Sequence, residues 1–139
     1  MERKILVVDD KQEIRELLSI ELERHGYTVA VAKSGGECLE KIKYEKFDLV
    51  LLDLQMPKLT GLQTLIEIKK INSDMNVIMM TGYAIVGTAV ESIKIGAYDY
   101  IIKPFSFDEL KDKIEKCLEK EFVEKQKILV VNNEPDSLN

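Results

Sequence analysis

The chain alternates short apolar runs with stretches of helical periodicity, and it does so five times. The apolar runs are continuous, which is typical of parallel strands covered on both faces. They lie at 5–8, 27–32, 49–52, 77–80 and 98–102. The helical stretches lie at 11–25, 36–44, 62–71, 84–95 and 106–118. This order predicts an α/β fold, in which helices cover both faces of a five-stranded parallel sheet.

Each helical stretch is expected to bury one apolar face. For the first helix the predicted face is Ile14, Leu17, Leu18 and Leu22, and for the third it is Leu62, Leu65 and Ile66. Gly26 is predicted to end the first helix, and Ser106 to cap the last one. Cys38 and Cys117 have no metal-ligating neighbours, so we expect two buried, reduced thiols.

Composition limits the classes of protein to which the chain can belong. With 139 residues and a formal net charge of −5, the chain suits one domain with a short extension. Its basic residues are scattered among acidic ones, which argues against direct nucleic-acid binding. No apolar run reaches membrane-spanning length, and the N-terminus lacks the pattern of a signal peptide. A cytoplasmic protein is therefore expected.

Polar side chains follow four of the five predicted strands. Asp9 and Asp10 come after the first strand, and the later strands are followed by Asp53, Thr81 and Lys103. Taken singly, each of these is more simply a loop or capping residue. Parallel strands, however, bring their carboxyl ends to one edge of the sheet, where such folds bind ligands. Their joint placement predicts a functional site.

The predicted site has a definite chemistry. Three carboxylates in one place repel one another unless a cation lies among them. Since no His or Cys is near them in the pattern, Mg²⁺ or Mn²⁺ is the expected cation. A magnesium ion with few protein ligands also binds phosphate oxygens, which Lys103 and Thr81 could contact. Asp53, between the charged neighbouring strands, is the best candidate to accept a phosphoryl group as an acyl phosphate.

These residues lie within longer motifs. In chain order they are ILVVDD, LVLLDLQMPKLTGL, VIMMTGYA and GAYDYIIKPF, and together they resemble the receiver domain of two-component response regulators. The resemblance covers about Lys4 to Leu118 and is strongest to receivers of NtrC-type transcriptional activators. It implies the flavodoxin-like fold of chemotaxis regulators, with strand order 2-1-3-4-5.

The resemblance also implies roles for single residues. Asp53 would be the phosphoacceptor, and Thr81 and Lys103 would contact the phosphoryl group. Asp9, Asp10 and Asp53 would hold Mg²⁺ together with the backbone carbonyl of Gln55.

Further roles concern conformation and lifetime. The bond from Lys103 to Pro104 would be cis. Tyr100 would be the switch aromatic that turns inward with Thr81, although a rim aromatic with its hydroxyl in water is the alternative. Gln55 and Tyr83 would tune the lifetime of the acyl phosphate.

The implied function is a signalling switch, not an enzyme acting on a separate substrate. A sensor histidine kinase or a phosphotransfer protein would donate the phosphoryl group. The response would be a shift in the face formed by the fourth helix, fifth strand and fifth helix, which would control an output domain, a second receiver or a homodimer. The alternative is a receiver-fold interaction module that works without phosphorylation.

Two enzyme classes fit less well. A phosphatase of the haloacid-dehalogenase type needs an acidic residue two positions after its nucleophile, where this chain has Gln55. A nucleotide-binding loop would need Lys followed by Ser or Thr after Gly82 and Gly87, where the chain has Thr88 and Ala89.

The chain also contains a repeat. The residues KILVV occur at 4–8 and again at 127–131, followed first by two aspartates and then by Asn132 and Asn133. We therefore expect a receiver domain at 1–120, a helical extension or linker at 121–126, and at 127–139 the truncated start of a second receiver. In this chain 127–131 would be a strand without its own sheet, and the second unit would bind Mg²⁺ poorly.

Overall fold

The computed structural model describes the backbone of residues 2–82 and 86–132, and the side chains of 2–82 and 87–120. Five strands and five helices alternate along it. They are β1 (Lys4–Val8), α1 (Gln12–Arg24), β2 (Thr28–Ala32), α2 (Gly35–Tyr44), β3 (Leu49–Asp53), α3 (Gly61–Ile71), β4 (Val77–Thr81), α4 (Val86–Ile95), β5 (Asp99–Ile102) and α5 (Phe107–Asn132). The predicted alternation of strands and helices is confirmed.

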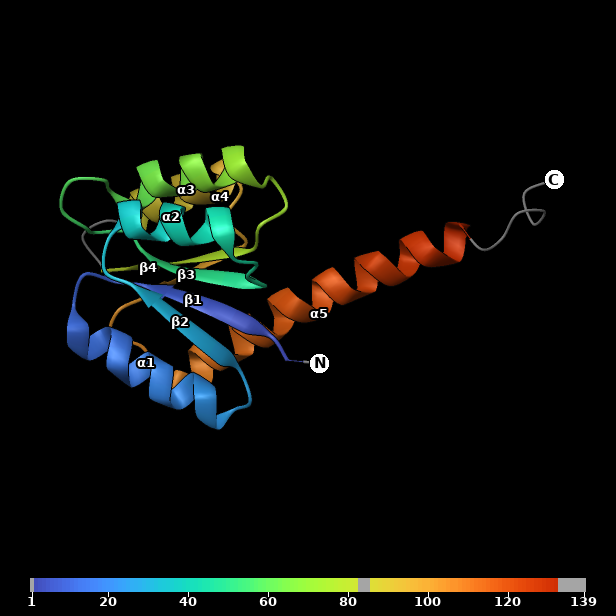
Figure 1. The fold of residues 1–139 in the computed structure, drawn as a ribbon, viewed down its shortest axis with the longest axis horizontal. Coiled ribbons are helices and arrows are strands. Elements are labelled where there is room, and N and C mark those ends of the chain that lie inside the picture. Colours follow the sequence, from blue (N-terminus) through green and yellow to red (C-terminus); the bar gives the residue numbers. More distant parts are fainter. Residues whose placement is uncertain (1, 83–85, 133–139) are drawn as a thin grey trace.

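The strands form one parallel sheet in the order β2-β1-β3-β4-β5, as the resemblance implied. Helices α2, α3 and α4 cover one face, and α1 and α5 cover the other (Figure 1). Because all strands run the same way, their carboxyl ends meet at one edge. In register, Val8 pairs with Leu52, and Thr81 pairs with Ile102. The residues that follow these strands are thereby brought to a common rim.

The core consists of two apolar clusters, one on each face of the sheet. Every residue of β3 and β4 is buried, which explains why these strands are continuous apolar runs in the sequence. Cys38 lies in one cluster and Cys117 in the other, and both are free and buried, as predicted. The prediction of an inward side chain was wrong for two residues, because Leu17 is 56% exposed and Ile66 is 37% exposed. Leu17 lies at the edge of the apolar face of α1, where Leu18 is buried. Ile66 lies at the edge of the apolar face of α3, where Leu65 is buried.

Local signals set the ends of two helices as predicted. Gly26 has φ of +90°, a left-handed conformation that glycine adopts without strain, and it follows His25, the C-cap of α1. The hydroxyl of Ser106 accepts a hydrogen bond from the backbone N–H of Glu109, which caps α5.

Helix α5 corrects the expectation for the repeated segment. The prediction of a strand at 127–131 was wrong, because the backbone there continues α5 to Asn132. A strand needs neighbouring strands for its N–H and C=O groups, whereas a helix pairs these groups within itself. The preceding residues, 119–126, are rich in Glu, Lys and Gln, which favour helix propagation.

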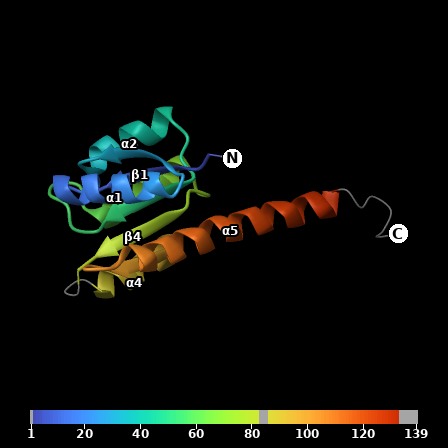
Figure 2. The ribbon, with the colours of Figure 1, turned by 90° about the horizontal axis from the view of Figure 1, so that it is seen from below.

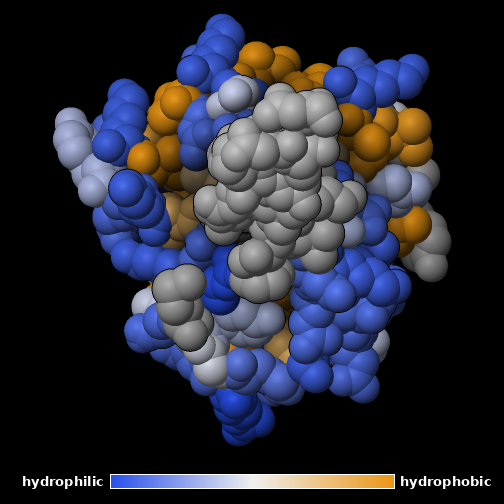
Figure 3. Space-filling model, turned by 90° about the vertical axis from the view of Figure 1, so that its right-hand side faces the viewer, coloured by the Kyte–Doolittle hydropathy of each residue, from blue (hydrophilic) through white to orange (hydrophobic). Residues whose placement is uncertain are grey.

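The last turns of α5 extend away from the sheet and its covering helices in two perpendicular views (Figures 1 and 2). Figure 3 shows the end of the molecule from which α5 leaves, where hydrophilic residues form most of the coloured surface. Within the described residues, no helix is both long and apolar enough to cross a bilayer.

Candidate functional site

Three acidic side chains meet at the carboxyl edge of the sheet. Asp9 and Asp10 directly follow β1, and Asp53 is the last residue of the adjacent strand β3. Each offers a carboxylate oxygen, and these oxygens lie within 4.8 Å of one another. Asp9 is fully buried, Asp53 is 4% exposed and Asp10 is exposed. The sequence correctly predicted that this trio would come together.

Lys103 reaches into the same group from the end of β5. Its Nζ lies 2.8 Å from Oδ2 of Asp9 and 3.4 Å from Oδ1 of Asp53. The peptide bond between Lys103 and Pro104 is cis, as the resemblance implied. Burial by itself lowers the pKa of Lys103, but the hydrogen bond to Asp9 and the charge of Asp53 raise it overall. The lysine is therefore a cation that neutralises part of the acidic cluster.

The ionised form of Asp53 is disfavoured in the folded protein. Burial is the main reason that its pKa rises to about 6, and the charge of Asp9 adds to the effect. Lys103 and the backbone N–H of Gln55 act in the opposite direction, and that N–H lies 3.2 Å from Oδ1 of Asp53. A cation beside these oxygens would relieve the repulsion. The donor set of three carboxylates, without His or Cys, fits a hard divalent ion such as Mg²⁺.

Thr81 ends β4, next to β3. Its buried hydroxyl donates to the carbonyl of Gly82 at 3.1 Å, and its own carbonyl accepts from the backbone N–H of Lys103 at 2.6 Å. The backbone contact ties Thr81 to the lysine of the site. Tyr100, on β5, is half-buried and packs against the core cluster that includes Met79. Both residues are on the elements where the sequence analysis placed them.

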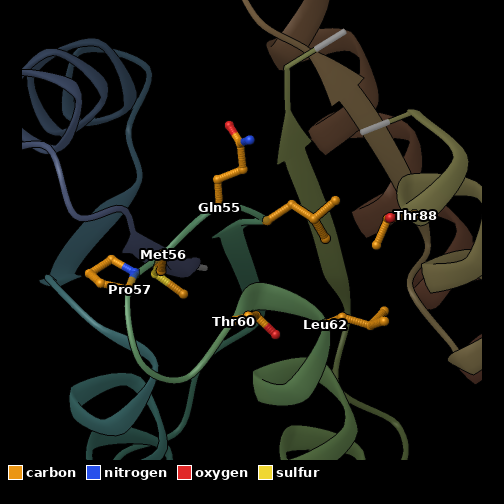
Figure 4. Close-up of a pocket in the computed structure, with 7 residues that line it drawn as sticks. Gln55, Met56, Pro57, Thr60, Leu62 and Thr88 are labelled. Carbon is orange, nitrogen blue, oxygen red and sulfur yellow. The ribbon is translucent and has the colours of Figure 1, made fainter. Parts of the chain in front are cut away.

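The two remaining predicted residues are Gln55, in the loop after β3, and Tyr83. Gln55 is exposed, and Tyr83 lies outside the described residues. A cavity of about 530 Å³ opens between this loop and α4, lined by Leu54, Gln55, Met56, Pro57, Thr60, Leu62 and Thr88. Figure 4 shows Met56 and Pro57 on one side of it and Thr88 on the other. Open space therefore separates the segment after Asp53 from α4.

Two residues of the site were missed by sequence reasoning. Arg15 donates from Nη1 to the backbone carbonyl of Asp9 at 2.8 Å. Gly61 packs so closely on β3 that a Cβ there would lie 2.5 Å from Cα of Leu54. A signal existed for the arginine, because a cation near the start of a helix is disfavoured by the helix dipole and so suggests a specific contact.

Comparisons with known proteins agree with this geometry. Residues 5–115 match the family model of the response regulator receiver domain. The transcriptional regulatory protein ZraR of Escherichia coli strain K12 is 47% identical over 114 residues, which is 82% of this chain and 26% of ZraR. The chain thus spans about a quarter of the length of this curated relative.

Solved structures show the same fold. The receiver domain of NtrX from Brucella abortus is 39% identical with a TM-score of 0.80, covering 83% of this chain and 98% of that one. The response regulator TrrA from Thermotoga maritima, solved in complex with Mg²⁺–BeF, is 42% identical with a TM-score of 0.76 and the same coverage. ZraR and NtrX are NtrC-type response regulators, which agrees with the resemblance of this chain to receivers of that type. The chain belongs to the family of response regulator receiver domains.

Proposed function

We propose that Asp53 accepts a phosphoryl group from a histidine kinase or phosphotransfer protein. In this step a carboxylate oxygen of Asp53 attacks the phosphorus of a phosphohistidine. A P–O bond forms, the P–N bond breaks, and the imidazole leaves and takes up a proton. The observation that carries this proposal is the position of Asp53, which is buried among Asp9, Asp10 and Lys103 at a carboxyl strand end.

Other residues hold the reacting groups. Asp9, Asp10, Asp53 and the backbone carbonyl of Gln55 bind Mg²⁺, or Mn²⁺ in its place. The Mg²⁺–BeF complex of TrrA supports this assignment by similarity. When bound, the cation neutralises charge on the phosphoryl oxygens. Lys103 and Thr81 contact these oxygens, and Lys103 already lies within hydrogen-bonding distance of the acids.

The phosphorylated state favours a different arrangement of α4, β5 and α5. Thr81 exchanges its bond to the Gly82 carbonyl for one to the phosphoryl group, and Tyr100 turns inward as the switch aromatic. The cavity beside Thr88 leaves room for α4 to move. This face then binds an output domain, a second receiver or another copy of the chain. Val90 and Ile93, at 45% and 39% exposed, give α4 an apolar surface for such contacts.

Hydrolysis returns the switch to its resting state. Water attacks the phosphorus of the acyl phosphate, and Asp53 leaves as a carboxylate. Gln55 is exposed beside Asp53, so we assign it an influence on this rate. On sequence grounds Tyr83 is assigned the same influence.

Intact-protein mass after incubation with acetyl phosphate and Mg²⁺ tests the phosphoacceptor. We expect one added phosphoryl group on the wild type and on Asp74→Asn, which changes an exposed aspartate in the loop after α3. Asp53→Asn and a sample with chelator should gain none, because the nucleophile or the cation is missing. A wild type that neither gains mass nor binds beryllofluoride with Mg²⁺ would contradict the proposal and favour an interaction module.

We also propose that the receiver ends near residue 120 and that 127–139 begins a second receiver-like unit. The identical residues at 4–8 and 127–131 support this division. In the second unit, Asn132 and Asn133 would replace the acids and bind Mg²⁺ poorly.

Removing residues 121–139 tests the boundary. Among the side chains that the structure describes, the buried ones of α5 include Leu110, Ile114 and Leu118, and these precede the cut. We therefore expect the free energy of unfolding, measured by urea titration, to change by less than about 0.5 kcal/mol. A loss of several kcal/mol would place 121–139 within the first domain.

A further inference from the structure

Arg15 connects α1 to the acidic end of β1. Its side chain is half-buried, and Nη1 donates to the main-chain carbonyl of Asp9 at 2.8 Å. This carbonyl belongs to the peptide that joins Asp9 to Asp10. The contact therefore acts on the orientation of one particular peptide plane, at the point where the chain leaves the sheet.

The other polar groups of Asp9 are held from other directions. Its N–H donates to the carbonyl of Ala32 at 3.1 Å. Its carboxylate accepts from the N–H of Lys11 at 2.9 Å and from Nζ of Lys103 at 2.8 Å. The carbonyl is the remaining polar group, and Arg15 fixes it. Asp9, which has no exposed surface, is therefore held at its N–H, its carboxylate and its carbonyl.

Asp10 differs from Asp9 in this respect. Among the described residues, no hydrogen bond or ion pair holds its exposed carboxylate. Its oxygen nevertheless lies within 4.8 Å of those of Asp9 and Asp53. The direction of the Asp10 side chain thus depends on its backbone, and the preceding peptide plane is the one that Arg15 holds.

We propose that Arg15 is a positioning residue for the divalent cation. By holding the Asp9 carbonyl, it directs Asp10 towards Asp53 before the ion binds. The inference rests on the proposed function, in which these three acids bind Mg²⁺. Groups that orient metal ligands typically change metal affinity by about 10–100-fold when they are removed.

If Arg15 acted mainly through its charge, its removal would change the Mg²⁺ affinity in the opposite direction. Arg15 is a cation bound to the main chain of Asp9, one of the three acids, and a nearby cation disfavours the binding of a second one. If charge were the main effect, removal of Arg15 would strengthen Mg²⁺ binding. If orientation is the main effect, removal weakens it. The direction of the change in affinity therefore decides between the two roles.

The test is Mg²⁺ titration of the whole chain, followed by amide NMR shifts. Arg15→Ala should raise the Kd about tenfold, and Arg15→Lys should recover part of the loss because it restores a donor that can reach the carbonyl. Arg24→Ala is the matched control, since it removes an exposed arginine that pairs with Glu21 at the other end of α1. Its Kd should equal that of the wild type.

Two further readouts separate positioning from general destabilisation. In metal-free protein, amide exchange at Lys11 should accelerate in Arg15→Ala, because the bond from Lys11 to Asp9 loosens. At saturating Mg²⁺, the rate of phosphorylation by acetyl phosphate should return close to the wild-type rate. If Arg15→Ala does not fold, Arg15→Gln is measured against the same criteria.

The outcomes distinguish this inference from the proposed function. A wild type that binds no Mg²⁺ would overturn both. A wild type that binds Mg²⁺, with an Arg15→Ala variant of equal or tighter affinity, would overturn only the positioning role. Weaker binding in Arg15→Ala with partial recovery in Arg15→Lys would support it.

Discussion

Replacement of Gly61 by alanine is expected to destabilise the protein by about 3 kcal/mol. Gly61 begins α3, and its N–H donates to the carbonyl of Leu54 at 3.1 Å. A Cβ at this position would overlap the carbonyl oxygen of Asp53 and lie 2.5 Å from Cα of Leu54. These are main-chain atoms of a buried strand and the turn after it, so they cannot rotate away as a side chain could. Relief requires a displacement of α3 from β3.

Urea denaturation of Gly61→Ala and of Gly36→Ala measures the effect. Gly36 lies in the first turn of α2, and a Cβ there would meet no atom within 4 Å. The control should therefore be neutral or stabilise by up to about 0.5 kcal/mol, because alanine favours the helix more than glycine does. Equal stability of Gly61→Ala and the wild type would show that α3 moves without loss of packing. Since the overlap includes the carbonyl of Asp53, we also expect slower phosphorylation of the folded variant.

The sheet and most of the site could be predicted because they depend on patterns within single segments. A parallel strand covered on both faces is apolar along its length, as β3 and β4 are up to their last residues, Asp53 and Thr81. Parallel strands also end at one edge, so polar residues after separate strands have to meet. This reasoning located Asp9, Asp53 and Lys103 without knowledge of any contact.

Arg15 and Gly61 could not be predicted in the same way. Their importance comes from main-chain atoms of other segments, namely the carbonyl of Asp9 and the backbone around Leu54. Periodicity describes which face of an element is apolar, but not which backbone group of a neighbour lies opposite. It also leaves the flanks of a helix face undecided, which is why Leu17 was wrongly placed inward.

The two KILVV segments show how context decides secondary structure. At 4–8 these residues form β1, with β2 on one side and β3 on the other. At 127–131 the same residues continue α5, where no neighbouring strand is available among the described residues. Local preference for a strand is weak compared with the need to pair backbone groups. A short apolar motif of this kind therefore forms a strand only where neighbouring strands are available to pair with it.

Without a divalent cation, Asp53 is expected to make the stability of the protein fall as pH rises. Its pKa is about 6 in the folded protein, against an ordinary value of 3.8. Below pH 3.8 the carboxyl is protonated in both the folded and the unfolded states, so it has no differential effect. Between 3.8 and 6 the unfolded chain releases the proton more readily, which favours unfolding. Above about pH 6 the loss is complete, and the shift corresponds to about 2–3 kcal/mol.

Asp53→Asn should remove this penalty. In chelator at pH 7.5, we expect the variant to exceed the wild type by about 2 kcal/mol in free energy of unfolding, and the difference should disappear as the pH falls below 3.8. Lys103 keeps its partner in the variant, because it remains 2.8 Å from Asp9. Asp74→Asn, at an exposed position, should follow the wild-type profile.

Mg²⁺ provides the second half of this test. An ion that binds only the folded state stabilises it by an amount that grows with the logarithm of its concentration relative to Kd. Saturating Mg²⁺ should therefore raise the stability of the wild type at pH 7.5 and should raise that of Asp53→Asn much less, because the variant lacks one carboxylate ligand. Parallel pH profiles for the two proteins in chelator would mean that neither burial nor the charge of Asp9 raises the pKa of Asp53. In that case its charge would be accommodated in the resting protein without a cation, and relief of repulsion would contribute nothing to Mg²⁺ binding.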